Sequence, residues 1–178
     1  MRLPWEPPKV ERAKIETLLG HGPRRLVTIG VRANEHTSRE RLAGYRAGMN
    51  RTSLAPRSGM VEHPDLLTAG RLGKILREHG GEGIFALNRV STLHVLRGSR
   101  EPGIKTGPEM PLISFDDFDR GDLLAPRLSV MQQPPEMLGR ESARLRFEWM
   151  KGPGAGKQPR AAVLPARLVI RESCGCRG

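Results

Sequence analysis

The sequence predicts an α/β protein in which helices flank an open parallel β-sheet. Short apolar segments, such as residues 26–31 and 83–87, are typical of buried strands, whereas longer segments with apolar residues three and four positions apart are typical of helices. The two kinds of segment alternate along the 178 residues. Strands separated by helices form βαβ units, whose strands run parallel. The length allows one domain or two small lobes.

The first half of the chain is expected to contain three helices and three strands. Residues 39–49 illustrate the helical pattern, because Leu42, Tyr45 and Met49 fall on one face. Pro64 suits the first turn of the third helix, where its missing N–H group costs nothing, and Gly80 ends that helix. The predicted helices are 9–19, 39–49 and 64–79, and the predicted strands are 26–31, 60–61 and 83–87.

The second half is expected to contain two helices and three strands. The predicted helices are 91–100 and 137–150, and the predicted strands are 110–115, 128–131 and 168–170. In the last helix Leu138, Leu145 and Trp149 share a face, and Gly152 follows its end. The residues from Cys174 onward are expected to fray.

The net charge of +11 raises the question of nucleic-acid binding, because it comes from 30 Lys and Arg against 19 Asp and Glu. The basic residues are scattered, without a run of five or more, and aromatic residues that could stack on bases make up only 4% of the chain. We therefore interpret the charge as an arginine-rich surface. A basic nucleic-acid-binding protein remains an alternative.

The cysteine content and the hydropathy of the sequence limit where in the cell the protein can be expected. The sequence has no apolar run of about 18 residues that could span a membrane, and no apolar signal segment follows Met1. Cys174 and Cys176 are the only cysteines, so the sequence contains no disulfide framework. We expect a cytoplasmic protein without a membrane partner.

No motif in the sequence indicates catalysis or a bound cofactor. The segment 152–157 resembles a phosphate-binding loop, but Lys151 stands where its first glycine is required and Gln158 where Ser or Thr is required. The five histidines show neither the spacing of a metal site nor a pairing with cysteine. We therefore expect no metal, no cofactor and no enzymatic activity.

Polar residues that follow three predicted strands form the candidate binding site. Arg39 and Arg41 begin the helix after the first strand, Asn88 follows the strand 83–87, and Asp116 opens an aspartate-rich stretch after the strand 110–115. Ligands of open parallel sheets bind beyond the carboxyl ends of the strands. A carboxylate, an amide and a guanidinium group suit a polyhydroxyl or amide-bearing ligand such as a sugar or nucleoside. An equally open alternative is that the Asp caps the following turn or helix and that Asn88 only adopts a left-handed backbone conformation.

Several segments, in the right order, resemble those of LacI/GalR-type bacterial transcription regulators. They are Arg39–Tyr45 (RERLAGY), Gly83–Asn88 (GIFALN), Ile113–Asp117 (ISFDD), Leu123–Pro126 (LLAP), Leu128–Pro134 (LSVMQQP), Leu138–Gly139 (LG) and Val163–Ser173 (VLPARLVIRES). The resemblance implies a periplasmic-binding-protein-like sensor, in which two α/β lobes close on a sugar, nucleoside or similar effector. It also implies that Arg41, Asn88 and Asp116 touch the effector.

The resemblance further implies how the chain is divided. Residues 20–135 are expected to form the second, C-terminal lobe of the sensor, residues 136–160 to belong to a mostly missing first lobe, and residues 161–173 to return to the second lobe as a closing strand. Leu138, Leu145 and Trp149 are then expected to lack a surface against which to bury.

Regulators of this family dimerise and bind DNA through an N-terminal helix-turn-helix domain, which the sequence does not contain. We therefore expect a truncated sensor domain that contacts DNA only through a domain absent from the chain. A stand-alone solute-binding protein of the same fold is the alternative.

Overall fold

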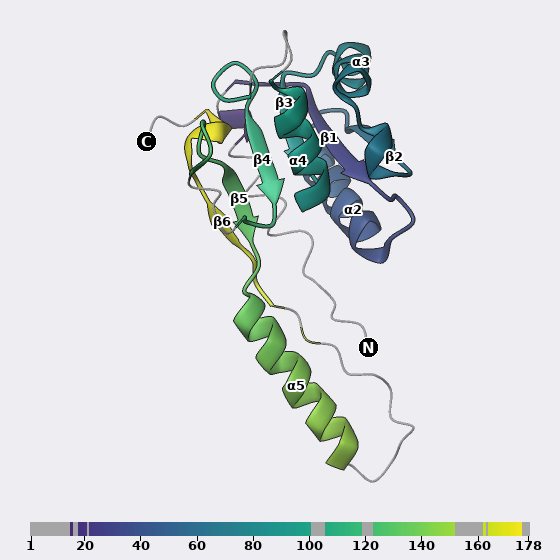
Figure 1. The fold of residues 1–178 in the computed structure, drawn as a ribbon, viewed down its shortest axis with the longest axis vertical. Helices are drawn as coiled ribbons and strands as arrows, with labels where there is room; N and C mark the ends of the chain where they lie inside the picture. Colours follow the sequence, from purple (N-terminus) through teal and green to yellow (C-terminus); the bar gives the residue numbers. More distant parts are fainter. Residues whose placement is uncertain are drawn as a thin grey trace.

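The fold of the chain is described by a computed structural model that covers residues 15, 18–20, 22–100, 106–118, 123–151, 162 and 164–175. Its strands form one six-stranded sheet in the order β2-β1-β3-β4-β5-β6 (Figure 1). The strands are β1 (Leu26–Val31), β2 (Arg57–Val61), β3 (Gly83–Ala86), β4 (Leu112–Phe115), β5 (Ser129–Gln132) and β6 (Arg167–Val169). The helices are α2 (His36–Arg51), α3 (Ala69–His79), α4 (Arg89–Gly98) and α5 (Pro135–Lys151), with 3-10 turns η1 (Pro64–Leu66) and η3 (Glu172–Cys174).

The predicted α/β fold class is confirmed, but the sheet is not parallel throughout. Strands β1 to β5 pair in parallel, whereas β6 runs antiparallel to β5. Figure 1 shows why β6 is antiparallel to β5. Helix α5 extends from the end of the sheet at which β5 stops, and β6 enters the sheet from that same end. A parallel β6 would need the chain to cross back to the opposite end of the sheet first.

Both faces of the central strands are covered, as is usual for parallel strands. Every residue of β1, β3 and β4 is buried. The core on one face joins these strands to α3 and α4, and includes Val27, Ile29, Leu72, Ile75, Ile84 and Val95. The core on the other face joins them to α2, and includes Leu26, Tyr45, Met49, Phe85, Ile113 and Phe115.

Tyr45 ties α2 to the two strands beneath it. Its hydroxyl donates a hydrogen bond to the carbonyl oxygen of Leu26 at 2.7 Å and accepts one from the backbone nitrogen of Arg57 at 3.1 Å. Burial raises the pKa of Tyr45 to about 12, so the hydroxyl keeps the proton that it donates. This contact fixes the position of α2 against β1 and β2.

The predicted boundaries of the third helix are wrong at its start. Pro64 begins η1, and α3 begins separately at Ala69. Thr68 has extended backbone angles and its side-chain oxygen accepts a hydrogen bond from the backbone nitrogen of Arg71 at 3.2 Å, which makes it the N-cap. Gly80 ends the helix with a left-handed φ of 55°, as predicted. Of the predicted helix 9–19, residues 9–14, 16 and 17 lie outside the described residues.

The expectation that the chain frays from Cys174 is wrong for that residue. Cys174 ends the turn η3 and is 0% exposed. The hydroxyl of Ser173 donates to the carbonyl oxygen of Leu112 and accepts from the backbone nitrogen of Ser129, both at 2.8 Å. These bonds dock the segment onto β4 and β5. Cys176 lies outside the described residues.

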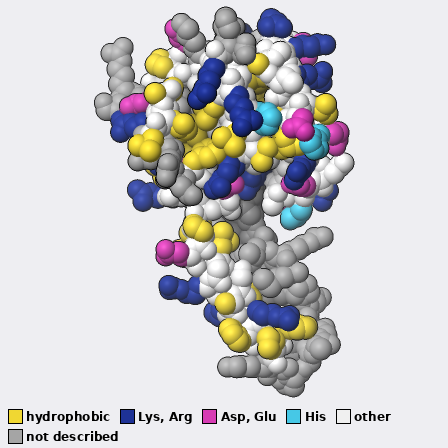
Figure 2. Space-filling model, viewed as in Figure 1, with side chains coloured by type: hydrophobic (Ala, Val, Ile, Leu, Met, Phe, Trp, Pro, Cys, Tyr) yellow, Lys and Arg dark blue, Asp and Glu magenta, His cyan; other side chains and the backbone are white. Residues whose placement is uncertain are grey.

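Helix α5 extends away from the sheet (Figure 1). Trp149 is 51% exposed, whereas Leu145 is only 7% exposed, so the expectation that the whole apolar face lacks a partner is wrong for Leu145. Arg144 forms ion pairs with Glu141 and Glu148 along the helix. Figure 2 shows hydrophobic and basic side chains interspersed on the visible side of this helix. In the part of the chain that the structure describes, no helix is long and apolar enough to cross a membrane.

Candidate functional site

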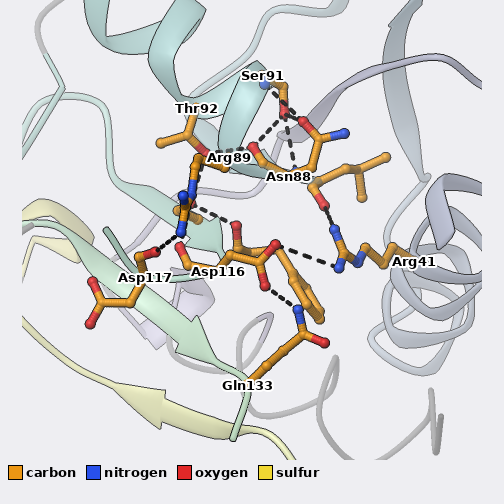
Figure 3. A network of polar contacts seen from close by, with 11 residues as sticks. Arg41, Asn88, Arg89, Ser91, Thr92, Asp116, Asp117 and Gln133 are labelled. Atoms are coloured by element: carbon orange, nitrogen blue, oxygen red, sulfur yellow. Dashed lines mark hydrogen bonds and ion pairs between the residues drawn. The ribbon is translucent and has the colours of Figure 1, made fainter. Parts of the chain in front are cut away.

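The candidate site lies at the edge of the sheet where the parallel strands end. Strand β1 has β2 on one side and β3 on the other, so the strand order reverses between β1 and β3. A reversal of this kind is the usual position of a ligand site in an open α/β sheet. Helix α2 begins soon after β1, and the segments after β3, β4 and β5 reach the same edge. Figure 3 shows side chains from all four segments meeting there.

Arg41 and Asp116 lie next to each other at this edge. Nη2 of Arg41 is 3.6 Å from Oδ2 of Asp116, and the two side chains are 12% and 25% exposed. Nη1 of Arg41 donates to the carbonyl oxygen of Leu87 at 2.8 Å, and its guanidinium carbon lies 3.7 Å from the centre of the Phe115 ring. The guanidinium plane is therefore fixed from two sides before any ligand binds.

Asp116 turns sharply out of β4. Its φ of 71° is in the left-handed region, which Asp tolerates better than most residues. Its backbone nitrogen donates to the carbonyl oxygen of Met131 at 3.0 Å. The turn directs its carboxylate toward Gln133, whose side-chain amide donates to Oδ1, and toward Arg41 (Figure 3).

Asn88 caps the helix that follows it. Its Oδ1 accepts a hydrogen bond from the backbone nitrogen of Ser91 at 2.8 Å, and the Ser91 hydroxyl accepts one from the backbone nitrogen of Asn88 at 3.2 Å. The left-handed conformation that the sequence left open for Asn88 is wrong, because its backbone is extended, with a φ of -160°, and the residue caps α4 instead. The cap does not use the side-chain NH2 group, which is the part of Asn88 that could donate to a ligand at the edge (Figure 3).

The structure does not join Arg39 to this cluster. The side chain of Arg39 is exposed, and its Nη1 donates to the carbonyl oxygen of Asn34 at 2.7 Å. Among the contacts of the described residues, none connects Arg39 with Arg41, Asn88 or Asp116. Two other aspartates of the acidic stretch, Asp119 and Asp122, lie outside the described residues.

Two further features of the site were missed in the sequence. Gln133 contacts Asp116 and directly follows β5, so the rule that selected the other residues after strand ends would also have found it. Asp117 faces away from Arg41 and forms an ion pair with Arg171, with Nη2 and Oδ2 at 2.9 Å. The hydrogen bonds from Arg171 hold the pKa of Asp117 below its ordinary value.

The side chains of the site are suited to hydrogen bonding. The residues that the structure describes contain no group of three or more His, Cys, Asp or Glu side chains that could hold a metal ion. The cluster offers a carboxylate, a guanidinium group and two side-chain amides. Because the positive charge of Arg41 is balanced by Asp116, a neutral ligand with several hydroxyl groups suits it better than an anion.

Residues 15–174 match the family described as periplasmic binding protein-like domain, and the chain therefore belongs to that family. More particularly, the chain is similar to transcription regulators. It is 26% identical over 166 residues to the HTH-type transcriptional regulator CelR of Thermobifida fusca, covering 91% of this chain and 48% of CelR. It is 29% identical over 138 residues to the HTH-type transcriptional regulator DegA of Bacillus subtilis, covering 76% of this chain and 40% of DegA.

Solved structures agree with this assignment. A complex of the transcriptional regulator CelR with cellobiose matches with a TM-score of 0.75 and 26% identity, over 93% of this chain and 50% of that chain. A putative ribose operon repressor from Burkholderia thailandensis matches with a TM-score of 0.78 and 26% identity, over 94% and 62%. The resemblance to LacI/GalR-type regulators is confirmed, and these relatives are regulators rather than enzymes. The chain spans about half the length of the curated relatives it matches.

Proposed function

We propose that this chain is the effector-sensing part of a LacI/GalR-type transcription regulator and that its effector is a sugar or a similar neutral polyhydroxyl molecule. The observation that carries the proposal is the pairing of Arg41 with Asp116 at the carboxyl edge of the sheet, 3.6 Å apart and mostly buried. Relatives that share the fold include a regulator in complex with cellobiose.

In the proposed complex, some side chains of the site accept hydrogen bonds from the ligand and others donate hydrogen bonds to it. The Asp116 carboxylate accepts protons from ligand hydroxyl groups, and Arg41 and the Asn88 amide donate to ligand oxygens. Gln133 and Phe115 hold Asp116 and Arg41 in place. A ligand without matching hydroxyl groups would leave these groups unpaired, which is the physical origin of the selectivity.

The division into lobes is also part of the proposal. Residues 20–135 form the second lobe, residues 136–160 belong to the first lobe, and residues 161–173 return to the second lobe. The course of α5 away from the sheet and the pairing of β6 with β5 support this division. Binding to DNA belongs to a helix-turn-helix domain outside these residues, and such a regulator works in the cytoplasm.

Titration of the purified chain with a small panel of ligands tests this function. Calorimetry with cellobiose, ribose, a sugar phosphate and a DNA duplex should show saturable binding of a neutral sugar, with NMR shifts at Arg41, Asn88 and Asp116. The duplex should bind at most weakly and without sequence preference, because in this proposal the base edges are read by a helix-turn-helix domain outside these residues. Failure of every neutral sugar, together with tight and steeply salt-dependent DNA binding, would favour a nucleic-acid-binding protein instead.

We also propose that the chain forms a homodimer through α4 and η1. The apolar side chains of Leu66, Val90 and Leu93 are 56%, 38% and 41% exposed, on two elements that contact each other. Val90 and Leu93 are three positions apart and therefore lie on the same side of α4. Apolar side chains that cluster on a surface are typical of protein–protein contacts.

Leu93→Asp is expected to convert the dimer to a monomer, because it places a charge in an apolar contact. Sedimentation velocity at several protein concentrations measures the change. Leu123→Asp, at a side chain that is 74% exposed outside α4 and η1, is the matched control and should leave the dimer intact. A dimer that persists in Leu93→Asp would place the contact elsewhere, such as on the exposed side chains of α5.

A further inference from the structure

The turn that carries Asp116 is held on its other side by an ion pair from the far end of the chain. Arg171 donates from Nη1 to Oδ1 of Asp117 at 3.0 Å and from Nη2 to Oδ2 at 2.9 Å. The two side chains are 20% and 17% exposed, so water screens the pair little. Two parallel bonds between a guanidinium fork and a carboxylate fix direction as well as distance.

Arg171 is itself fixed against the sheet. Its Nη1 also donates to the carbonyl oxygen of Leu128 at 2.7 Å, just before β5. Its backbone nitrogen donates to the hydroxyl of Ser129 at 2.8 Å. Asp117 is therefore bound to a guanidinium group whose position is fixed by hydrogen bonds to the sheet.

A second arginine holds the same turn from the helix side. Nη2 of Arg89 donates to the carbonyl oxygen of Asp117 at 3.1 Å, and its guanidinium carbon lies 5.5 Å from the centre of the Phe118 ring. Asp117 is thus bound through its side chain by Arg171 and through its backbone by Arg89, and Figure 3 shows the second of these contacts.

Asp116 needs this support because of its backbone conformation. Its φ of 71° is unfavourable for a residue with a side chain, and such conformations persist only where the surroundings enforce them. Adjacent residues on this turn face opposite ways, with Asp116 toward Arg41 and Asp117 toward Arg171. Fixing Asp117 therefore constrains the backbone from which the Asp116 carboxylate projects.

We propose that Arg171, through its paired bonds to Asp117, is a positioning residue for effector binding and keeps the Asp116 carboxylate beside Arg41 and Gln133. The inference rests on the proposed function, in which Asp116 accepts hydrogen bonds from the effector. Arg171 acts through Asp117. The planar guanidinium group of Arg171 is essential to this role, because it forms two hydrogen bonds in fixed directions, whereas the ammonium group of a lysine is a point charge without a fixed direction.

The test compares Arg171→Gln and Arg171→Lys with a neighbouring control. Arg127→Gln removes the ion pair of Arg127 with Glu172 at 2.9 Å, whose side chains are 51% and 41% exposed and which does not reach the turn. Two NMR signals report the geometry directly, namely the backbone amide of Asp116 and the side-chain amide of Gln133, which donates to Asp116. Calorimetry with the neutral sugar that binds the unmodified chain most tightly, starting from cellobiose, reports the affinity.

We expect both Arg171 variants to shift the two signals and to weaken sugar binding about 10-fold or more, while Arg127→Gln leaves signals and affinity unchanged. If Arg171→Gln does not fold, Arg171→Lys, which keeps the charge, and Asp117→Asn, which keeps the size of the side chain, give the same comparison. Signals and affinity that match the unmodified chain in these variants would overturn the inference. If the unmodified chain binds no sugar, the proposed function fails, and the two NMR signals alone decide whether Arg171 positions Asp116.

Discussion

Asp116→Asn is expected to weaken binding of a neutral sugar about 100-fold without disturbing the fold. Each hydrogen bond to a charged group contributes about 1.5–3 kcal/mol, and a carboxylate can accept such bonds from two ligand hydroxyl groups. The amide keeps one acceptor oxygen and loses the charge, so a loss of about 2.7 kcal/mol, or about 100-fold in affinity, follows. Asn also tolerates the left-handed φ of 71° at this position, so the turn itself is preserved.

Isothermal titration calorimetry on the purified chain measures this loss, and thermal unfolding checks the fold. The matched control is Asp65→Asn, since the Asp65 side chain is 85% exposed and its ion pair is with His63. The control should bind the sugar as the unmodified chain does. An Asp116→Asn chain with full affinity would show that the effector does not use this carboxylate.

Phe85→Ala is expected to lower the free energy of unfolding by about 3–5 kcal/mol, the usual cost of removing a buried aromatic ring. Phe85 lies in the central strand β3 and is 1% exposed. Its ring stacks on that of Tyr45, with centroids 6.1 Å apart and 24° between the planes. Removal therefore leaves a cavity between the sheet and α2, and deprives Tyr45 of its stacking partner.

Urea unfolding followed by circular dichroism measures this change. Phe147→Ala on α5 removes the same atoms from a side chain that is 59% exposed, and should change the free energy of unfolding by about 0.5 kcal/mol or less. Equal effects of the two substitutions would contradict the assignment of Phe85 to a packed core.

The position of the candidate site could be inferred from the sequence because parallel strands bring their carboxyl ends to one edge. Arg41, Asn88 and Asp116 each follow a strand that hydropathy identifies, and the structure places all three at that edge. Arg39 satisfies the same rule but makes its hydrogen bond to Asn34. The rule uses only the position of a residue after a strand, and not the side of the helix on which the residue lies, so it could not separate Arg39 from Arg41.

The contacts that shape the site were not visible in the sequence. Arg171 and Asp117 are 54 residues apart, and no local pattern pairs a particular arginine with a particular carboxylate among 30 Lys and Arg. The left-handed conformation of Asp116 is likewise set by its neighbours in space. Its backbone nitrogen bonds to Met131 in β5, and its carboxylate bonds to Gln133, which directly follows β5.

The sequence by itself determined the presence of the strands and helices from Leu26 to Gly98, though not where α3 begins, together with the α/β class and the resemblance to LacI/GalR-type regulators. These depend on hydropathy periods and short motifs, which neighbouring residues encode locally. Only the tertiary structure decided that β6 is antiparallel, that Cys174 is buried and that Asp117 pairs with Arg171. Each of these features depends on how segments that are distant in the sequence pack together. The free energy of such a contact depends on both segments at once, so the local sequence of either segment does not predict it.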